Sequence, residues 1–232
     1  DNSDVPDGAD DIFINVENNC NVDARCYKNS EAKFTILFFH GNGEIVSDYN
    51  VLAEHFIKLG CEFIVCDFRG YGRSDGVPTL KSSLKDASTI YYYLRDNKFL
   101  KKNVCVMGRS LGSASAIELC SRVSEVTCCI IESGYADPIP LVERRGLNIT
   151  NITSVEIALF SNSEKIRLVK CPILIIHGEM DSLISPREAN LNYKNASSTH
   201  KKLAMLEEVG HNNIMMAREN AYFSCMSSFF SQ

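Results

Sequence analysis

Short, continuous apolar runs alternate along this chain with longer stretches in which apolar residues recur every three or four positions. The runs are FTILFF (34–39), EFIVCDF (62–68), NVCVM (103–107), VTCCII (126–131), PILIIH (172–177) and KLAMLE (202–207). Runs of this length, bounded by polar and turn-forming residues, predict buried β-strands. The spaced positions between them, such as Leu84, Ala87, Tyr91 and Leu94, predict amphipathic helices.

The two ends of the chain add a hairpin and a helix. DIFINV and NVDARCY flank the turn-like ENNC, which predicts an antiparallel β-hairpin. Helical spacing predicts a helix over 45–59 and a closing helix with Ile214, Ala221 and Phe229 on its apolar side. Residues 1–10 are acidic and contain Pro and Gly, which favours a flexible tail.

Continuous apolar strands separated by amphipathic helices indicate a mostly parallel sheet covered by helices on both faces. We therefore predict an α/β fold in which residues 11–232 form one domain. The stretch 134–170, which contains Pro138 and Pro140, interrupts the alternation of strands and helices. It predicts a short cap over the edge of the sheet where the active site is expected. The alternative is a plain connection that contains one helix.

The composition of the chain argues against a nucleic-acid-binding protein and against a transmembrane protein. The chain has 232 residues and a net charge of -5, with no Lys/Arg block, which argues against nucleic-acid binding. The apolar runs fall far short of the roughly 20 residues that span a bilayer, so no transmembrane segment is predicted. The 10 cysteines match no zinc spacing and include no C-x-x-C, which favours free thiols in a reducing compartment.

The chain begins with Asp1 rather than Met, so we expect an incomplete N-terminus, and a targeting or lipidation segment could belong to the missing part. These features together are typical of a cytoplasmic protein or one that associates peripherally with a membrane. The sequence does not indicate an oligomeric state.

A G-R-S-x-G pattern occurs twice, around Ser74 and around Ser110. A nucleophilic serine of this pattern requires a strand directly before it and a helix directly after it. The strand-like NVCVM precedes Ser110, and the helix-like LGSASAIEL follows it. Ser74 instead follows the loop-like RGYGR and precedes Asp75, with Pro78 shortly after. The context favours Ser110 as the nucleophile over a purely structural turn there, and it predicts that Ser74 shapes a loop beside the site.

A serine nucleophile requires a base, and histidine is the usual one. His40, His177 and His211 each follow a strand, so position alone leaves all three as candidates. The chain order serine, acid, histidine recurs in sheets of this type, and only His211 leaves room for an acid after Ser110.

The acid is expected after a strand between the nucleophile and the base. Glu132 follows VTCCII, and Glu179 and Asp181 follow PILIIHG. We favour Asp181 because it lies in the loop beyond its strand, where a carboxylate can fix the tautomer of the histidine. Glu132 remains the alternative, with a hydrogen-bonding role at its strand end as the simpler interpretation.

The oxyanion of an acyl-transfer reaction requires backbone N–H donors. The N–H of Leu111, directly after the nucleophile, is one candidate. The other is Asn42 in HGNGE (40–44), where flanking glycines let the backbone turn its amides inward. A plain strand-to-helix turn is the alternative interpretation of this loop. The set requires no metal and no cofactor.

With these pieces in place, the chain resembles the α/β-hydrolase superfamily, most closely its serine aminopeptidase and monoacylglycerol lipase-like group. FFHGNGE, CDFRGYGRSDG, GRSLGSA, HGEMD and GHNN occur in that family's order over residues 11–231. The eukaryotic branch that includes protein depalmitoylases is the nearest in pattern. The resemblance implies a Ser110–Asp181–His211 triad with Asn42 and Leu111 at the oxyanion hole. The 134–170 stretch is shorter than the cap of the larger family members. The cysteine-rich N-terminus of the depalmitoylases is not present in this sequence.

The predicted function is a metal-independent serine hydrolase that acts on a small-molecule or lipid-like ester or thioester. The alternatives are a non-catalytic binding protein of the same fold and a serine peptidase. Arg144 and Arg145 in the expected cap are candidates for contact with an acidic headgroup, although solvated charges are the simpler interpretation.

Overall fold

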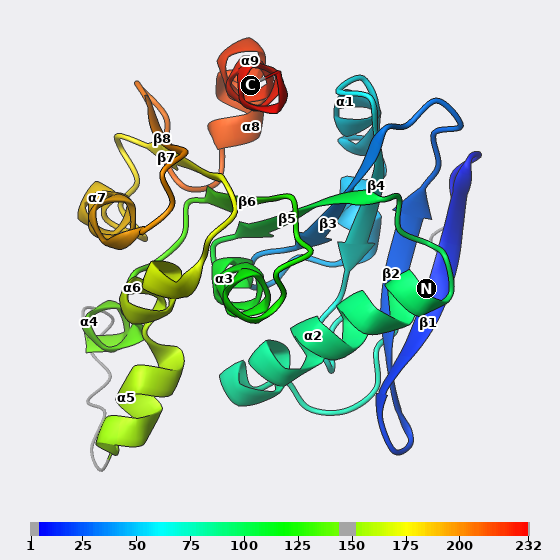
Figure 1. Ribbon diagram of the computed structural model, residues 1–232, viewed down its shortest axis with the longest axis horizontal. Coiled ribbons are helices and arrows are strands. Elements are labelled where there is room, and N and C mark those ends of the chain that lie inside the picture. The colour runs from blue at the N-terminus through cyan, green and yellow to red at the C-terminus, as the bar shows by residue number, and fades with distance from the viewer. Residues whose placement is uncertain (1–4, 144–151, 232) are drawn as a thin grey trace.

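The structure is a computed structural model that describes residues 5–143 and 152–231. Within these residues the centre of the molecule is one eight-stranded sheet (Figure 1). Its strands are, in chain order, β1 (Ala9–Glu17), β2 (Cys20–Tyr27), β3 (Phe34–Phe39), β4 (Cys61–Cys66), β5 (Asn103–Arg109), β6 (Cys128–Glu132), β7 (Ile173–Gly178) and β8 (Lys201–Leu206). The order across the sheet is β1-β2-β4-β3-β5-β6-β7-β8.

Strands β3 to β8 run parallel to one another, while β1 and β2 form an antiparallel hairpin whose second strand pairs antiparallel with β4. This arrangement confirms the predicted α/β fold with an N-terminal hairpin. Strand β1 begins at Ala9, slightly before the domain boundary expected at residue 11. The carboxyl ends of the six parallel strands lie at one edge of the sheet, where the loops that follow them meet.

Helices cover both faces of the sheet. They are η1 (Val46–Tyr49), α1 (Ala53–Ile57), α2 (Leu80–Asp96), α3 (Gly112–Arg122), α4 (Pro138–Glu143), α5 (Ser154–Phe160), α6 (Asn162–Lys165), η2 (Ile166–Leu168), α7 (Pro186–Asn195), α8 (Ile214–Ala217) and α9 (Glu219–Phe230). Figure 1 shows α1, α8 and α9 on one face and α2, α3 and α7 on the other. Helices α4 to α6 project from the α3 side and occupy the stretch expected to form the cap.

The helix expected over 45–59 is divided in two. A 3₁₀ turn, η1, ends before Asn50, and α1 begins three residues later. The Asn50 side-chain oxygen accepts hydrogen bonds from the Tyr27 hydroxyl at 2.7 Å and from Arg25 Nη1 at 2.8 Å. These bonds tie the segment to β2, which interrupts the helix that the apolar spacing alone predicted.

The closing helix is also divided, and its buried side differs from the prediction. Arg218 adopts φ -132° and ψ 39° between α8 and α9, which is not helical. Helix α9 consequently buries Tyr222, Met226 and Phe229, while Ala221 is exposed. The break rotates α9 relative to the single-helix pattern, so Ile214 and Phe229 are correct core positions and Ala221 is not.

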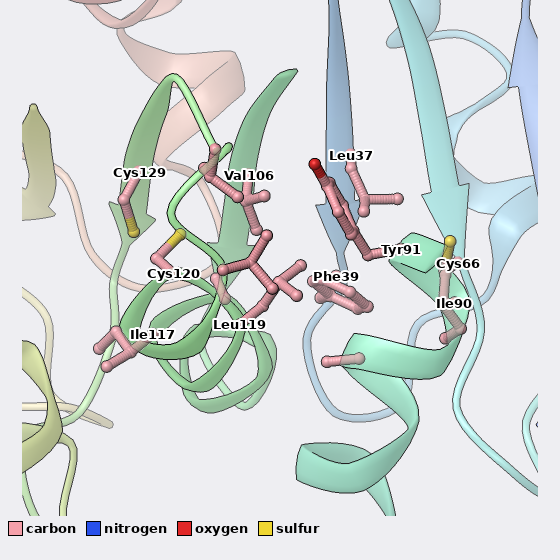
Figure 2. Close-up of a cluster of buried hydrophobic side chains, with 14 of the residues drawn as sticks. Leu37, Phe39, Cys66, Ile90, Tyr91, Val106, Ile117, Leu119, Cys120 and Cys129 are labelled. Atoms are coloured by element: carbon pink, nitrogen blue, oxygen red, sulfur yellow. The ribbon is translucent and has the colours of Figure 1, made fainter. Parts of the chain in front are cut away.

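Successive residues of the central strands pack on opposite faces. In β5, Val106 belongs to the core beneath α2 and α3, and Met107 belongs to the core beneath α1 and α9. Figure 2 shows the first of these cores, in which Phe39 of β3 and Val106 of β5 face Ile90 of α2 and Leu119 of α3. Burial on both faces explains why the strands are continuous apolar runs rather than alternating ones.

All 10 cysteines are free thiols, and eight of them are buried. Burial raises the pKa of Cys26 and of Cys61 to about 12, so both thiols stay protonated at neutral pH. They pack as small apolar side chains, as the sequence indicated.

Helix α3 approaches the sheet closely at its first turn. A Cβ atom on Gly112 would lie 2.0 Å from the Phe39 carbonyl oxygen, and one on Gly108 would lie 2.3 Å from the Gly112 carbonyl oxygen. These two glycines therefore let β3, β5 and α3 meet at the turn that carries Ser110.

We expect Gly112→Ala to lower the free energy of unfolding by about 1–3 kcal/mol, because the new methyl group collides with backbone that cannot move independently. Urea denaturation measures this change. Gly60→Asn is the control, because Gly60 has φ +83° with no neighbouring atom within 4 Å and asparagine tolerates that conformation. An equal loss in both variants would contradict the close-approach explanation.

Candidate active site

Ser110 lies between the end of β5 and the first turn of α3, with φ +51°. This left-handed conformation is unusual for a residue other than glycine. Hydrogen bonds hold the backbone on both sides: the Ser110 N–H donates to the Glu132 carbonyl at 2.9 Å, and the Ser113 hydroxyl donates to the Ser110 carbonyl at 2.6 Å. The turn therefore presents the Ser110 hydroxyl at the carboxyl edge of the sheet.

The structure brings Ser110, Asp181 and His211 together from three different strand ends. His211 Nε2 lies 2.9 Å from Ser110 Oγ, and His211 Nδ1 lies 2.7 Å from Asp181 Oδ2. Both distances are those of hydrogen bonds. A proton on Nδ1 directed at the carboxylate leaves Nε2 free to accept the proton of the serine hydroxyl.

The loops that carry the acid and the histidine are fastened to each other. A Cβ atom on Gly178 would lie 2.4 Å from the Val209 carbonyl oxygen, so only glycine permits this approach. The same carbonyl accepts the Met180 N–H at 2.9 Å, and the Gly210 N–H donates to Asn213 Oδ1 at 2.8 Å. These contacts set the separation of Asp181 and His211.

Asp181 is held as a carboxylate although it is buried. Its Oδ1 accepts the N–H groups of Leu183 at 2.9 Å and Ile184 at 2.8 Å, while Oδ2 faces His211. Burial acts to raise the pKa of Asp181, but the hydrogen bonds from His211 and Ile184 outweigh it and lower the pKa below its usual range. The side chain therefore carries a negative charge beside the imidazole at neutral pH.

The other two candidate histidines are fully buried, and His177 Nε2 also lies 3.4 Å from Asp181 Oδ2. His40 Nδ1 lies 2.8 Å from the Gly41 carbonyl oxygen, and Nε2 lies 3.1 Å from Asp67 Oδ1. His177 Nε2 donates to the Ile184 carbonyl at 2.9 Å and so supports the loop of Asp181. Each ring therefore braces a loop of the site from behind.

The alternative acids also lie apart from the imidazole. Glu132 is buried at the end of β6, where its Oε2 accepts the Tyr222 hydroxyl at 2.7 Å. Glu179 is exposed to solvent. The structure therefore pairs His211 with Asp181 and gives Glu132 the hydrogen-bonding position that the sequence offered as its simpler interpretation.

Two backbone amides, one in the loop after β3 and one directly after Ser110, remain unpaired. The N–H groups of Asn42 and Leu111 make no hydrogen bond within residues 5–143 and 152–231. Leu111 is the N-cap of α3, where amides lack helical acceptors. Asn42 is exposed, and its side-chain oxygen accepts the hydroxyl of Tyr71. Sequence reasoning missed Tyr71, although the residue opens the YGRSDG stretch.

The second G-R-S stretch has a structural role in this fold. The Ser74 hydroxyl accepts the Asp23 N–H at 2.8 Å, and Arg73 Nε donates to Asp23 Oδ2 at 2.8 Å. Gly72 has φ +52°, and a Cβ atom there would lie 2.2 Å from Asp67 Oδ2. This loop is thereby fixed to β2, and it carries Tyr71 to Asn42.

Arg144 and Arg145 lie outside the described residues. In the remainder of the chain, no three His, Cys, Asp or Glu side chains are placed to share a metal ion. The same residues contain no helix that is both long and apolar enough to cross a membrane.

Known proteins are similar in sequence to this chain over most of its length. Alpha/beta hydrolase domain-containing protein 17B of Homo sapiens is 30% identical over 213 residues, which are 90% of this chain and 69% of the relative. The chain belongs to the α/β-hydrolase superfamily. The profile of the family described as "Serine aminopeptidase, S33" matches residues 30–143 of this α/β-hydrolase. Protein bem46 of Schizosaccharomyces pombe is 28% identical over 209 residues, covering 87% of the chain and 69% of the relative.

Solved structures share the fold of this α/β-hydrolase. An esterase of Pyrococcus furiosus, Pf2001, superposes with a TM-score of 0.80 at 20% identity, covering 96% of this chain and 91% of the other. Est1E of Butyrivibrio proteoclasticus gives a TM-score of 0.76 at 17% identity, covering 96% and 99% of the two chains. Membership of the superfamily supports hydrolase activity.

The stability of this α/β-hydrolase should fall in mild acid, in part through His177. Burial lowers the pKa of His177 below its usual value of about 6.5, so folding favours the neutral ring. Its contribution is complete above that value and is lost as the pH falls through the lowered pKa of the folded state. Urea unfolding between about pH 7.5 and pH 5 should therefore lose less stability in His177→Gln than in the wild type.

The matched control for this experiment is His200→Gln, because His200 is exposed before β8. This variant should retain the wild-type dependence of stability on pH. A wild-type dependence in His177→Gln as well would show that the buried ring does not contribute.

Proposed function

We propose that this α/β-hydrolase is a serine hydrolase that cleaves carboxylic ester or thioester bonds through an acyl-enzyme on Ser110. One observation carries the proposal: His211 bridges Ser110 Oγ at 2.9 Å and Asp181 Oδ2 at 2.7 Å. The three side chains lie on separate loops at the edge of the sheet where ligands of parallel α/β folds bind. A serine, a base and an orienting acid in hydrogen-bond contact form the arrangement of nucleophilic catalysis.

In the first half of the reaction, Ser110 Oγ attacks the carbonyl carbon while His211 Nε2 takes the hydroxyl proton. Asp181 stabilises the imidazolium that forms and keeps the proton of Nδ1 in place. The carbonyl oxygen becomes an oxyanion, which the N–H groups of Asn42 and Leu111 are proposed to stabilise. The tetrahedral intermediate collapses as the C–O or C–S bond breaks, and the leaving group receives the proton from His211.

In the second half, His211 takes a proton from a water molecule, which attacks the acyl carbon. The bond to Ser110 Oγ breaks, the hydroxyl regains its proton from His211, and a carboxylic acid leaves. The two steps together consume one water molecule and regenerate the free enzyme. The unpaired amides support this sequence, because donors that lack a partner in the resting protein can bind the developing charge.

The serine aminopeptidase description of the matching family makes peptide hydrolysis the second candidate function. A panel that contains p-nitrophenyl esters, acyl thioesters and aminoacyl anilides separates the two activities. Turnover of anilides alone would favour the peptidase. Correctly folded protein that turns over no member of the panel would favour a non-catalytic binding protein.

A fluorophosphonate probe should label wild-type protein at Ser110, and Ser110→Ala should abolish labelling. Ser74→Ala is the matched control, because it removes the same group from the same motif. It should cost about 1 kcal/mol of stability through its lost bond to Asp23 and leave labelling unchanged. Mass spectrometry of the labelled peptide identifies the modified serine. Labelling that persists in Ser110→Ala would refute the proposal.

The acid is tested by the rate of the same labelling. Asp181→Asn should slow it by about 10³–10⁴-fold, because the amide favours the wrong imidazole tautomer. Glu179→Gln, two positions earlier in the same loop, should label at the wild-type rate. Equal effects of both substitutions would exclude a specific role for Asp181.

The acyl chain of the substrate is expected to be apolar, because Met180 and Leu183 beside the acid are 67% and 42% exposed. We predict that kcat/KM for p-nitrophenyl esters rises at least about tenfold from acetate to octanoate, since each buried methylene contributes roughly 0.8 kcal/mol. The double variant Met180→Ser/Leu183→Ser should flatten this increase while retaining activity on acetate. A decline with chain length would indicate a small-molecule esterase instead.

A further inference from the structure

A buried group of charges lies directly beside the proposed nucleophile. Arg109, the residue before Ser110, is only 8% exposed, and its Nε lies 3.0 Å from Glu44 Oε1 and 3.7 Å from Glu132 Oε1. Glu44 belongs to the loop after β3, and Glu132 ends β6. The guanidinium thus joins three neighbouring strand ends of the active edge, and the mechanism above does not use it.

Glu44 in turn fixes the loop that carries Asn42. Its Oε2 accepts the Gly41 N–H at 2.7 Å and the Tyr49 hydroxyl at 2.7 Å. A Cβ atom on Gly41 would lie 2.9 Å from Glu44 Oε1, so glycine allows the carboxylate to close over this turn. The Glu44 carboxylate therefore fixes the His40–Gly41 peptide, which is one peptide unit before the one that carries the Asn42 N–H.

Glu132 holds the other side of the turn. Its backbone carbonyl accepts the Ser110 N–H at 2.9 Å, and its fully buried side chain accepts the Tyr222 hydroxyl. Burial raises the pKa of Glu132 despite the nearby guanidinium. Without Arg109, the buried Glu132 carboxyl and the partly buried Glu44 carboxylate would lose the cation between them, and the cost would fall on the segments that carry Asn42 and Ser110.

Apolar packing alone does not hold this region. A cavity of about 180 Å³ is bordered by Glu44, Arg109 and Glu132, and also by Asn212, the neighbour of His211. The loop after β3 consequently has space into which it can shift. The Glu44–Arg109 ion pair lies at this cavity and links the loop to the residue before Ser110.

We infer that Arg109 and Glu44 are positioning residues, whose ion pair sets the separation of the Asn42 and Leu111 amides that stabilise the oxyanion. The inference rests on the proposed serine hydrolase function. Neither side chain contacts the reacting atoms: Arg109 anchors the turn that continues into Leu111, and Glu44 anchors the turn that contains Asn42. A change in their contact should affect the transition state more than the binding of substrate.

The test compares Arg109→Met with Arg25→Met. Arg25 is likewise an ion-paired arginine of the protein interior, with its Nε 2.6 Å from Asp11 Oδ1 in the hairpin at the far edge of the sheet. We expect Arg109→Met to lower kcat for a p-nitrophenyl ester about 10²-fold, as the loss of an oxyanion donor does, with a change in KM below about threefold. Fluorophosphonate labelling should slow in parallel. Arg25→Met should lower the thermal midpoint but preserve kcat.

Three further variants show whether the fall in kcat depends on the Glu44–Arg109 ion pair. Glu44→Gln, whose side chain is 24% exposed in the wild type, should lower kcat about tenfold, and it carries the test if Arg109→Met does not fold. Arg109→Lys should restore part of the lost kcat. The Glu44→Gln/Arg109→Met double variant should lose less than the product of the two single losses, because both act on one contact.

Several results would overturn the inference: wild-type kcat in Arg109→Met or Glu44→Gln, a loss expressed in KM alone, or the same fall in kcat in Arg25→Met. Failure of the proposed function is recognised separately, because wild-type protein would then not be labelled at Ser110. The positioning role would fall with it. Labelled wild type with unchanged variants would remove the positioning role alone.

Discussion

The strained backbone of Ser110 is the constraint on which the rest of the site depends. A residue with a side chain at φ +51° requires surrounding structure to hold it there. The Glu132 carbonyl and the Ser113 hydroxyl do so from both sides of the residue. Gly108 and Gly112 allow the helix to begin directly against the sheet, which leaves little room around this turn. The fold therefore fixes the proposed nucleophile in the resting protein.

The parallel sheet was predictable because both of its faces are buried. Each central strand became a continuous apolar run, and its boundaries in the structure differ by only a few residues from those of the run. The helices at 45–59 and near the C-terminus were less predictable. Their breaks at Asn50 and Arg218 depend on hydrogen bonds to β2 and on a local backbone conformation, neither of which affects apolar spacing.

The proposed triad was predictable for a topological reason. Chain order and strand ends place Ser110, Asp181 and His211 at one edge, and local glycines then bring the loops into contact. The Glu44–Arg109 pair and the Tyr71–Asn42 bond were not predictable in this way. Many polar side chains follow strands at the same edge, and the choice among partners depends on rotamers and on the depth of each loop. Sequence position therefore identifies which side chains lie at the same edge of the sheet, and the three-dimensional structure is needed to identify which of them pair.

The two G-R-S stretches show how strongly that difference matters. Each places an arginine between a glycine and a serine, and in both the arginine binds carboxylates: Arg73 binds Asp23, and Arg109 binds Glu44. In the first stretch the serine hydroxyl accepts a backbone N–H and so helps to hold the loop against β2. In the second stretch, the structural hydrogen bonds are made by the serine backbone, and the serine hydroxyl faces His211. The same motif therefore has two outcomes. Where the serine hydroxyl makes the structural hydrogen bond, the motif fixes a loop; where the serine backbone makes it, the hydroxyl faces the histidine.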